Sequence, residues 1–236
     1  MRGSLLTILV LAVLAVIALP YLVLSPVLEG AVARNLQDRL GLAERPAVDL
    51  ESDPQWEMLL GEFSDGRISL GEADLGGVRA ESVSVDLDPF SVDVGESVRS
   101  RAAVPEGPLS GRVRLTVSEE EVSRLAGQNV EVPVNNVELR RDGVTVESEA
   151  TFLGVTIPVA VDGGVGVDGN ALVFRPGTVR AAGTTVPEDL ADSLLAGTAF
   201  SYPVGGLPYG AELSDAETVD GAVVLTGRVS GVEIGG

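Results

Sequence analysis

Short alternations of apolar and polar residues, separated by Asp-Gly dipeptides, run through most of the sequence. The dipeptides stand at 142–143, 168–169 and 220–221, and they tolerate the positive φ angles of tight hairpins. Alternation with a period of two places the apolar side chains on one face of a strand. The pattern therefore predicts a mostly antiparallel β domain. The clearest alternating stretches are 68–70, 83–87, 113–117, 144–146, 155–161 and 223–225.

The glycine-rich stretch VDGGVGVDGN at 161–170 partly fits two binding motifs. A dinucleotide cradle needs a helix directly after its glycines, but residues 171–174 have the pattern of a strand. A calcium-binding β-roll works by stacking many repeats, and the chain has one imperfect copy. We interpret the stretch as a hairpin turn, because the alternation continues on both sides of it.

Four short helices are predicted, each from apolar residues at helical spacing and a start or stop signal such as Ser25-Pro26 or Gly61. Helices of two or three turns are unstable unless they pack on a larger element. We therefore expect an α+β fold in which the helices pack on sheet. The predicted helices span 25–40, 53–61, 118–127 and 187–196.

Residues 5–24 form an apolar run without a charged side chain. A helix of about twenty residues crosses a hydrocarbon core about 30 Å thick, whereas a secretory signal has a shorter apolar region. We expect 1–24 to be a transmembrane anchor in the cytoplasmic membrane, or alternatively a long signal sequence that is cleaved. Either expectation places 25–236 outside the cytoplasm, as one exported domain that is single-pass anchored or secreted.

Composition excludes several classes of function. The net charge is −19 and the chain lacks His, Cys and Lys. Such a chain repels nucleic acid, and it cannot form a Ser-His-Asp triad, a thiol nucleophile or an ordinary zinc site. A hydrolase using carboxylates alone is conceivable at Glu119, Glu120 and Glu121, but these acids are better explained as a capping box at a helix start. We therefore expect no catalysis, no metal and no cofactor.

Four segments resemble the LmeA family of actinobacterial phospholipid-binding envelope proteins. They are DPQWEMLLGEFSDGRISLGEADLGGVRAESVSVDL at 53–87, LTVSEEEVSRLAG at 115–127, FRPGTVRAAGTTVPEDLADSLL at 174–195 and LPYGAELSDAETVDGAVVLTGRVSGVEI at 207–234. The resemblance implies an exported protein that binds phospholipid and supports envelope glycolipid assembly. It also implies a long helix against a curved sheet, as in tubular lipid-binding folds.

A strongly curved antiparallel sheet with the amphipathic helix 25–40 across its concave side can leave an apolar cleft for acyl chains. The same side chains can instead close a dry core, which would leave a structural or scaffolding envelope domain that binds another protein. The sequence leaves both alternatives open. The candidate lipid contacts are Leu28, Val32, Leu36, Trp56, Leu59, Leu60, Phe63, Phe90, Leu153, Ile157, Phe174 and Tyr209.

One local group of basic residues interrupts the acidic sequence. It consists of Arg99, Arg101, Arg112 and Arg114. On a strand, Arg112 and Arg114 point to one face, so this group could bind a phospholipid headgroup. The alternative is an ordinary solvated strand face.

Overall fold

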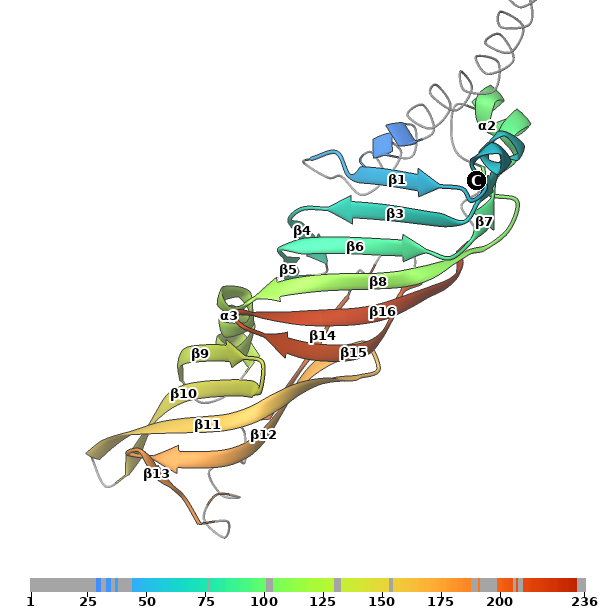
Figure 1. Cartoon of the computed structure of the whole chain (residues 1–236). Coiled ribbons are helices and arrows are strands. Elements are labelled where there is room, and N and C mark those ends of the chain that lie inside the picture. Colours follow the sequence, from blue (N-terminus) through green and yellow to red (C-terminus); the bar gives the residue numbers. More distant parts are fainter. Residues whose placement is uncertain are drawn as a thin grey trace, which may run out of the picture. The chain divides into compact units, whose positions relative to one another are not determined.

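The computed structural model describes residues 29–30, 33–34, 37, 44–75, 77–100, 104–129, 133–152, 155–187, 191, 199–205, 207 and 210–232. Most of them lie in two six-stranded sheets (Figure 1). The fold is mostly antiparallel β with few helices, which confirms the prediction made from the alternating stretches. Within the described residues no helix is both long and apolar enough to cross a bilayer. The expected anchor at 5–24 lies outside these residues.

The first sheet has the order β1-β3-β6-β8-β16-β15. Its strands are β1 (Ala47–Glu51), β3 (Asp65–Leu70), β6 (Ser82–Leu87), β8 (Leu109–Ser118), β15 (Glu212–Val219) and β16 (Ala222–Val232). Two small two-stranded sheets accompany it. They pair β2 (Glu62–Phe63) with β7 (Phe90–Ser91), and β4 (Ala73–Leu75) with β5 (Val78–Ala80).

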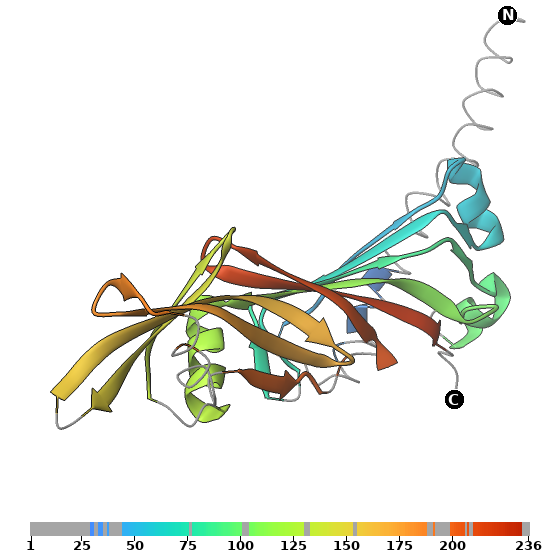
Figure 2. The same ribbon diagram turned by 90° about the horizontal axis from the view of Figure 1, so that it is seen from below.

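The second sheet has the order β13-β12-β11-β10-β9, and β14 also pairs with β12. Its strands are β9 (Val134–Arg140), β10 (Gly143–Phe152), β11 (Val155–Asp168), β12 (Ala171–Ala181), β13 (Thr184–Thr185) and β14 (Phe200–Pro203). The long strands β11 and β12 twist along their length (Figure 2). Their register shifts between Asp162 and Gly163, and such a bulge increases local twist.

The glycine-rich stretch lies in β11 and in the turn that follows it. Asp168 pairs with Ala171, and Gly169 has a φ of 56°. The predicted hairpin is therefore confirmed. Gly163 is needed for packing, because a Cβ there would lie 2.4 Å from the Arg175 carbonyl oxygen.

The structure describes three helical elements in full: η1 (Gln55–Leu60), α2 (Val94–Ser100) and α3 (Glu119–Asn129). The predictions at 53–61 and 118–127 are confirmed, although η1 is a 3₁₀ helix. The sequence analysis missed α2, whose start is capped by the Asp93 carboxylate accepting from the Glu96 amide at 2.8 Å. An Asp followed three residues later by Glu was the available signal.

The other two predicted helices fall mostly outside the described residues. In the segment 25–40 the structure describes 29, 30, 33, 34 and 37, and all five are helical. Of the segment 187–196 it describes only Pro187 and Ala191. The placement of the N-terminal helix across a concave sheet therefore stays a prediction.

The described residues belong to two compact units. One lies within Met1–Leu70, Ser84–Arg112 and Val229–Gly236, and the other within Gly71–Val83 and Val113–Arg228. We call them unit 1 and unit 2. The boundary falls inside β6, β8 and β16, so the residues of these strands are assigned to a unit individually.

Each unit has buried apolar side chains of its own. In unit 1, Leu50, Met58, Phe63 and Val92 form one cluster, and Phe63 stacks on Phe90 with the ring centroids 5.0 Å apart. In unit 2 the buried side chains come from α3 and from several strands, among them β8, β12 and β16. They include Val113, Leu115, Val117, Val122, Leu125, Val223 and Leu225.

Met58 is the side chain of η1 that enters the unit 1 cluster, with 1% of its surface exposed. Replacing it by Ala leaves a cavity, so we expect Met58→Ala to lower the free energy of unfolding by about 3 kcal/mol. Urea unfolding of the protein in detergent solution measures this. Leu60→Ala on the same helix is the control, and at an exposed position it should cost less than about 0.5 kcal/mol. Equal losses would contradict the packing described for η1.

Candidate functional site

In unit 1, strands β1, β3 and β6 share one apolar face. Val48 of β1 pairs with Ile68 of β3, and Leu50 pairs with Gly66. A Cβ on Gly66 would touch the side chains of both Leu50 and Leu87, so Leu87 of β6 points to this same face. Val85 lies two residues before Leu87 and therefore shares the face.

The opposite face of the same strands is polar. Arg67 of β3 donates from Nε to the Asp86 carboxylate of β6 at 2.7 Å. The hydrogen bond to Asp86 raises the pKa of Arg67, and both side chains are partly exposed to solvent. The two faces of β3 and β6 thus differ sharply in chemistry.

The apolar face is incompletely covered. Leu50 is buried at its edge in the unit 1 cluster, against which Val48 also packs, but five large apolar side chains are only half-buried. We use the name "apolar face" for these five: Val48, Ile68, Leu70, Val85 and Leu87. Neighbouring half-buried apolar side chains on one face provide a surface against which hydrocarbon can be removed from water.

Seven of the twelve predicted lipid contacts lie among the described residues. Leu28, Val32, Leu36, Leu153 and Tyr209 lie outside the described residues. The other seven are split between the two units. Trp56, Leu59 and Leu60 are exposed on η1, and Phe63 and Phe90 belong to the unit 1 interior or its edge. Ile157 is half-buried on β11 and Phe174 is buried against Phe200. Their contact with lipid stays a prediction.

Of the strands of the apolar face, β3 and β6 were predicted from the sequence, whereas β1 and the candidate role of all three were not. Alternation marks Ile68 and Val85 as members of an apolar strand face. Alternation does not show whether another element covers that face. Such cover decides whether the face belongs to a core or forms a surface that binds a ligand.

The predicted headgroup residues are found in two places, and the structure describes three of the four. Arg112 and Arg114 are exposed on the face of β8 opposite to the buried Val113 and Leu115. Neither forms an ion pair within the described part of the chain. Arg99 lies on α2 and is hydrogen-bonded to Glu96, and Arg101 lies outside the described residues.

If Arg112 and Arg114 bind a headgroup, their removal should matter most for negatively charged lipid. We expect Arg112→Gln with Arg114→Gln to weaken binding of anionic phospholipid about tenfold, because charged hydrogen bonds contribute about 1.5–3 kcal/mol. Binding of zwitterionic phospholipid should change less. Comparison of the two lipids in a fluorescent phospholipid uptake assay measures this. Arg228→Gln, at another exposed arginine, is the control, and equal losses for both lipids would contradict the assignment.

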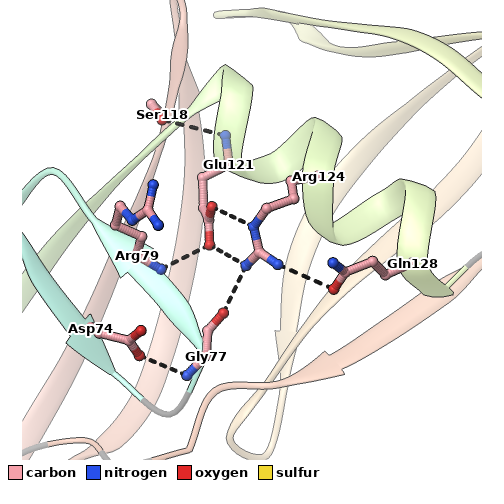
Figure 3. Close-up of polar contacts among 7 residues, drawn as sticks. All are labelled: Asp74, Gly77, Arg79, Ser118, Glu121, Arg124 and Gln128. Carbon is pink, nitrogen blue, oxygen red and sulfur yellow. Dashed lines mark hydrogen bonds and ion pairs between the residues drawn. The ribbon is translucent and has the colours of Figure 1, made fainter.

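Glu119 and Glu121, two of the three acids at the start of α3, have structural partners in unit 2, and Figure 3 shows those of Glu121. The Glu121 carboxylate accepts from the Arg79 amide at 2.8 Å and from Arg124 Nε at 2.7 Å. Arg124 also donates to the Gly77 carbonyl at 2.8 Å. These contacts join α3 to the β4–β5 hairpin. Glu119 accepts from the Leu139 amide of β9 at 2.7 Å.

The capping box predicted at Ser118 is half formed. The Ser118 hydroxyl accepts from the Glu121 amide at 3.4 Å, but the Glu121 side chain turns to Arg124 and Arg79. The hydrogen bond from Arg124 lowers the pKa of Glu121; burial opposes this shift and the Arg79 amide reinforces it. Glu121 is therefore an ionised side chain with several hydrogen-bond donors around it. This geometry favours a role in holding the fold together over a role in acid–base chemistry.

Because the pKa of Glu121 is lowered, the contribution of this side chain to stability depends on pH. Its ionised form contributes to stability above the unfolded pKa of about 4.3, and this contribution is lost as pH falls through the folded pKa. We expect Glu121→Gln to lower the free energy of unfolding by about 2 kcal/mol at pH 7 and by clearly less at about pH 3. Urea unfolding at both pH values measures this. Glu120→Gln, at the exposed neighbour, should cost a few tenths of a kcal/mol. An equal deficit for Glu121→Gln at both pH values would contradict the account.

Comparison with known protein families matches residues 21–228 to the LmeA-like phospholipid-binding family. No match was found among curated proteins or among solved structures. The match covers most of the 236 residues, including η1, α3 and the strands of the apolar face. It confirms the resemblance carried by the four quoted segments. The chain therefore belongs to the LmeA-like phospholipid-binding family.

Proposed function

We propose that this protein holds or shuttles a phospholipid outside the cytoplasmic membrane during the assembly of cell-envelope glycolipids. In this proposal residues 1–24 anchor the chain to that membrane, or are removed on export. The single observation that carries it is the family match over residues 21–228. The apolar run at 5–24 supports the anchor, since its length suits a bilayer.

The acyl chains would lie on the apolar face of β1, β3 and β6. Each methylene removed from water there contributes about 0.8 kcal/mol, so a dozen methylenes contribute about 10 kcal/mol before the costs of binding are subtracted. The loss of translational and rotational freedom on association, about 4–15 kcal/mol, offsets a large part of this gain. The mechanism needs no catalytic group, and the family is a lipid-binding one.

The segment that contains the described residues 29, 30, 33, 34 and 37 is our candidate for a second wall over the apolar face. Its described residues are helical, and Ala33 is 3% exposed. A buried small residue on a helix indicates that this side of the helix packs on something. A helix that covers the half-buried side chains incompletely would leave room for hydrocarbon between them.

The alternative function is a scaffolding domain with a filled core. The observation that favours it is the unit 1 cluster, in which Leu50, Met58, Phe63 and Val92 pack on one another. This packing shows that some of the apolar side chains fill a core without any ligand. The two functions differ in whether Ile68 and Val85 contact lipid.

Photo-crosslinking tests the proposal directly. The full chain, purified in detergent, is loaded with a phospholipid that carries a diazirine in its acyl chain, and the labelled peptides are identified by mass spectrometry. We expect labels on β3 and β6. Ile68→Thr with Val85→Thr should reduce labelling and retained lipid about tenfold, because each change places a hydroxyl where hydrocarbon would bind without a hydrogen-bond partner.

The chain offers a matched control on the same two strands. Ser69→Thr with Ser84→Thr adds threonine to the polar face, and both substitutions keep residues suited to strands. This control should retain lipid like the unsubstituted protein. Failure of the unsubstituted protein to retain lipid or to be labelled would favour the scaffolding domain. Equal retention by all three proteins, or labels scattered over both faces, would contradict the placement of lipid on the apolar face.

A further inference from the structure

Three large apolar side chains project into solvent from η1. The exposed fractions are 56% for Trp56, 37% for Leu59 and 64% for Leu60. They surround a single inward-pointing side chain, Met58, which is buried in the unit 1 cluster. We call the three exposed side chains the "η1 knob". Exposed apolar residues are ordinary when single, but three on one short helix form a patch.

The η1 knob stands on a fixed support. The helix ends at Gly61, whose φ is 85° and whose amide donates to the Met58 carbonyl at 3.1 Å. The Val92 amide donates to the Gly61 carbonyl at 2.8 Å, and a Cβ on Gly61 would lie 2.1 Å from the Val92 carbonyl oxygen. Together with buried Met58, these contacts hold the helix against the core, so exposure of the knob is imposed by the fold.

The size of the knob argues against a protein partner. At roughly 200 Å² for a large apolar side chain, the three expose about 300 Å². A stable protein–protein interface needs about 800 Å² from each partner. A patch this small is better suited to insertion into a lipid surface, where each apolar side chain is buried individually and no complementary shape is required.

The residue types of the η1 knob and the charges near it in the sequence indicate which kind of lipid surface it fits. Trp is enriched at the boundary between membrane and water, because its ring is apolar and its N–H is polar. The charged residues that flank or interrupt the knob in the sequence, Asp53, Glu57 and Glu62, are all acidic, and η1 has no basic residue in its last turn. An anionic lipid surface would be repelled, so the knob fits a zwitterionic phospholipid bilayer.

We infer that the η1 knob inserts Trp56, Leu59 and Leu60 into the interface of a zwitterionic phospholipid bilayer. This goes beyond the proposed function, because it adds a contact with the bilayer itself at side chains separate from the apolar face. A protein that exchanges lipid with a bilayer gains from a defined orientation on it, and the η1 knob supplies one.

The only Trp of the chain is itself the probe. The full chain is reconstituted into phosphatidylcholine vesicles, with or without brominated acyl chains, and Trp56 emission is recorded. We expect brominated lipid to quench the emission several-fold, and acrylamide to quench it less in vesicles than in detergent-free unfolded protein. Replacing part of the phosphatidylcholine by anionic phosphatidylglycerol should reduce the quenching by brominated lipid.

Two variants make the test specific. Leu59→Ser with Leu60→Ser should reverse most of the quenching by brominated lipid, because it removes the apolar neighbours of Trp56. Val155→Ser, at a side chain 61% exposed on β11, should leave it unchanged. Crosslinking of acyl-chain phospholipid to β3 and β6 should persist in the η1 double variant, so failure of docking is distinguishable from failure of the proposed function.

Two outcomes would overturn the inference. In one, Trp56 stays accessible to acrylamide and insensitive to brominated lipid in vesicles. In the other, it is shielded from acrylamide without being quenched by brominated lipid, which would mean that protein covers the knob.

Discussion

The difference between the two faces of β1, β3 and β6 is the constraint on which the lipid-binding account depends. Strand geometry places Ile68 on one face and Arg67 on the other, and the ion pair from Arg67 to Asp86 joins β3 to β6 on the polar face. A slip of one residue in either strand would exchange the two faces. The polar contacts thus help to keep the half-buried apolar side chains together on the face where hydrocarbon can bind.

Several of the abundant acidic residues hold elements of the fold together. Glu121 is held by Arg124 and the Arg79 amide, Glu119 accepts from β9, and Asp162 is bound by Arg180 at 2.7 Å. Burial acts to raise the pKa of Asp162, but hydrogen bonds from Arg180 and Thr145 lower it overall. The ion pair of Asp162 with Arg180 joins neighbouring strands, and the hydrogen bonds of Glu121 and Arg124 with backbone groups join α3 to the β4–β5 hairpin. These structural roles of the acidic residues are consistent with a family that binds phospholipid.

Local sequence signals predicted local structure well, because turns and helix ends depend on a few neighbouring residues. Asp168-Gly169 marked the hairpin after β11, and Gly61 marked the end of η1. The candidate site was harder to predict, because exposure depends on what the rest of the chain covers. Trp56 and Phe63 both look like members of an apolar surface in the sequence, yet Trp56 is exposed and Phe63 is buried. The helix α2 was missed because its apolar residues are too few to show a period.

Native mass spectrometry of the full chain, released from detergent micelles in the gas phase, tests the central claim most directly. If hydrocarbon binds the apolar face, the protein will carry an added mass equal to one or more phospholipids. That mass should diminish when Ile68 and Val85 are both replaced by threonine. A spectrum containing only the mass of the polypeptide, unchanged after incubation with phospholipid, would contradict the account.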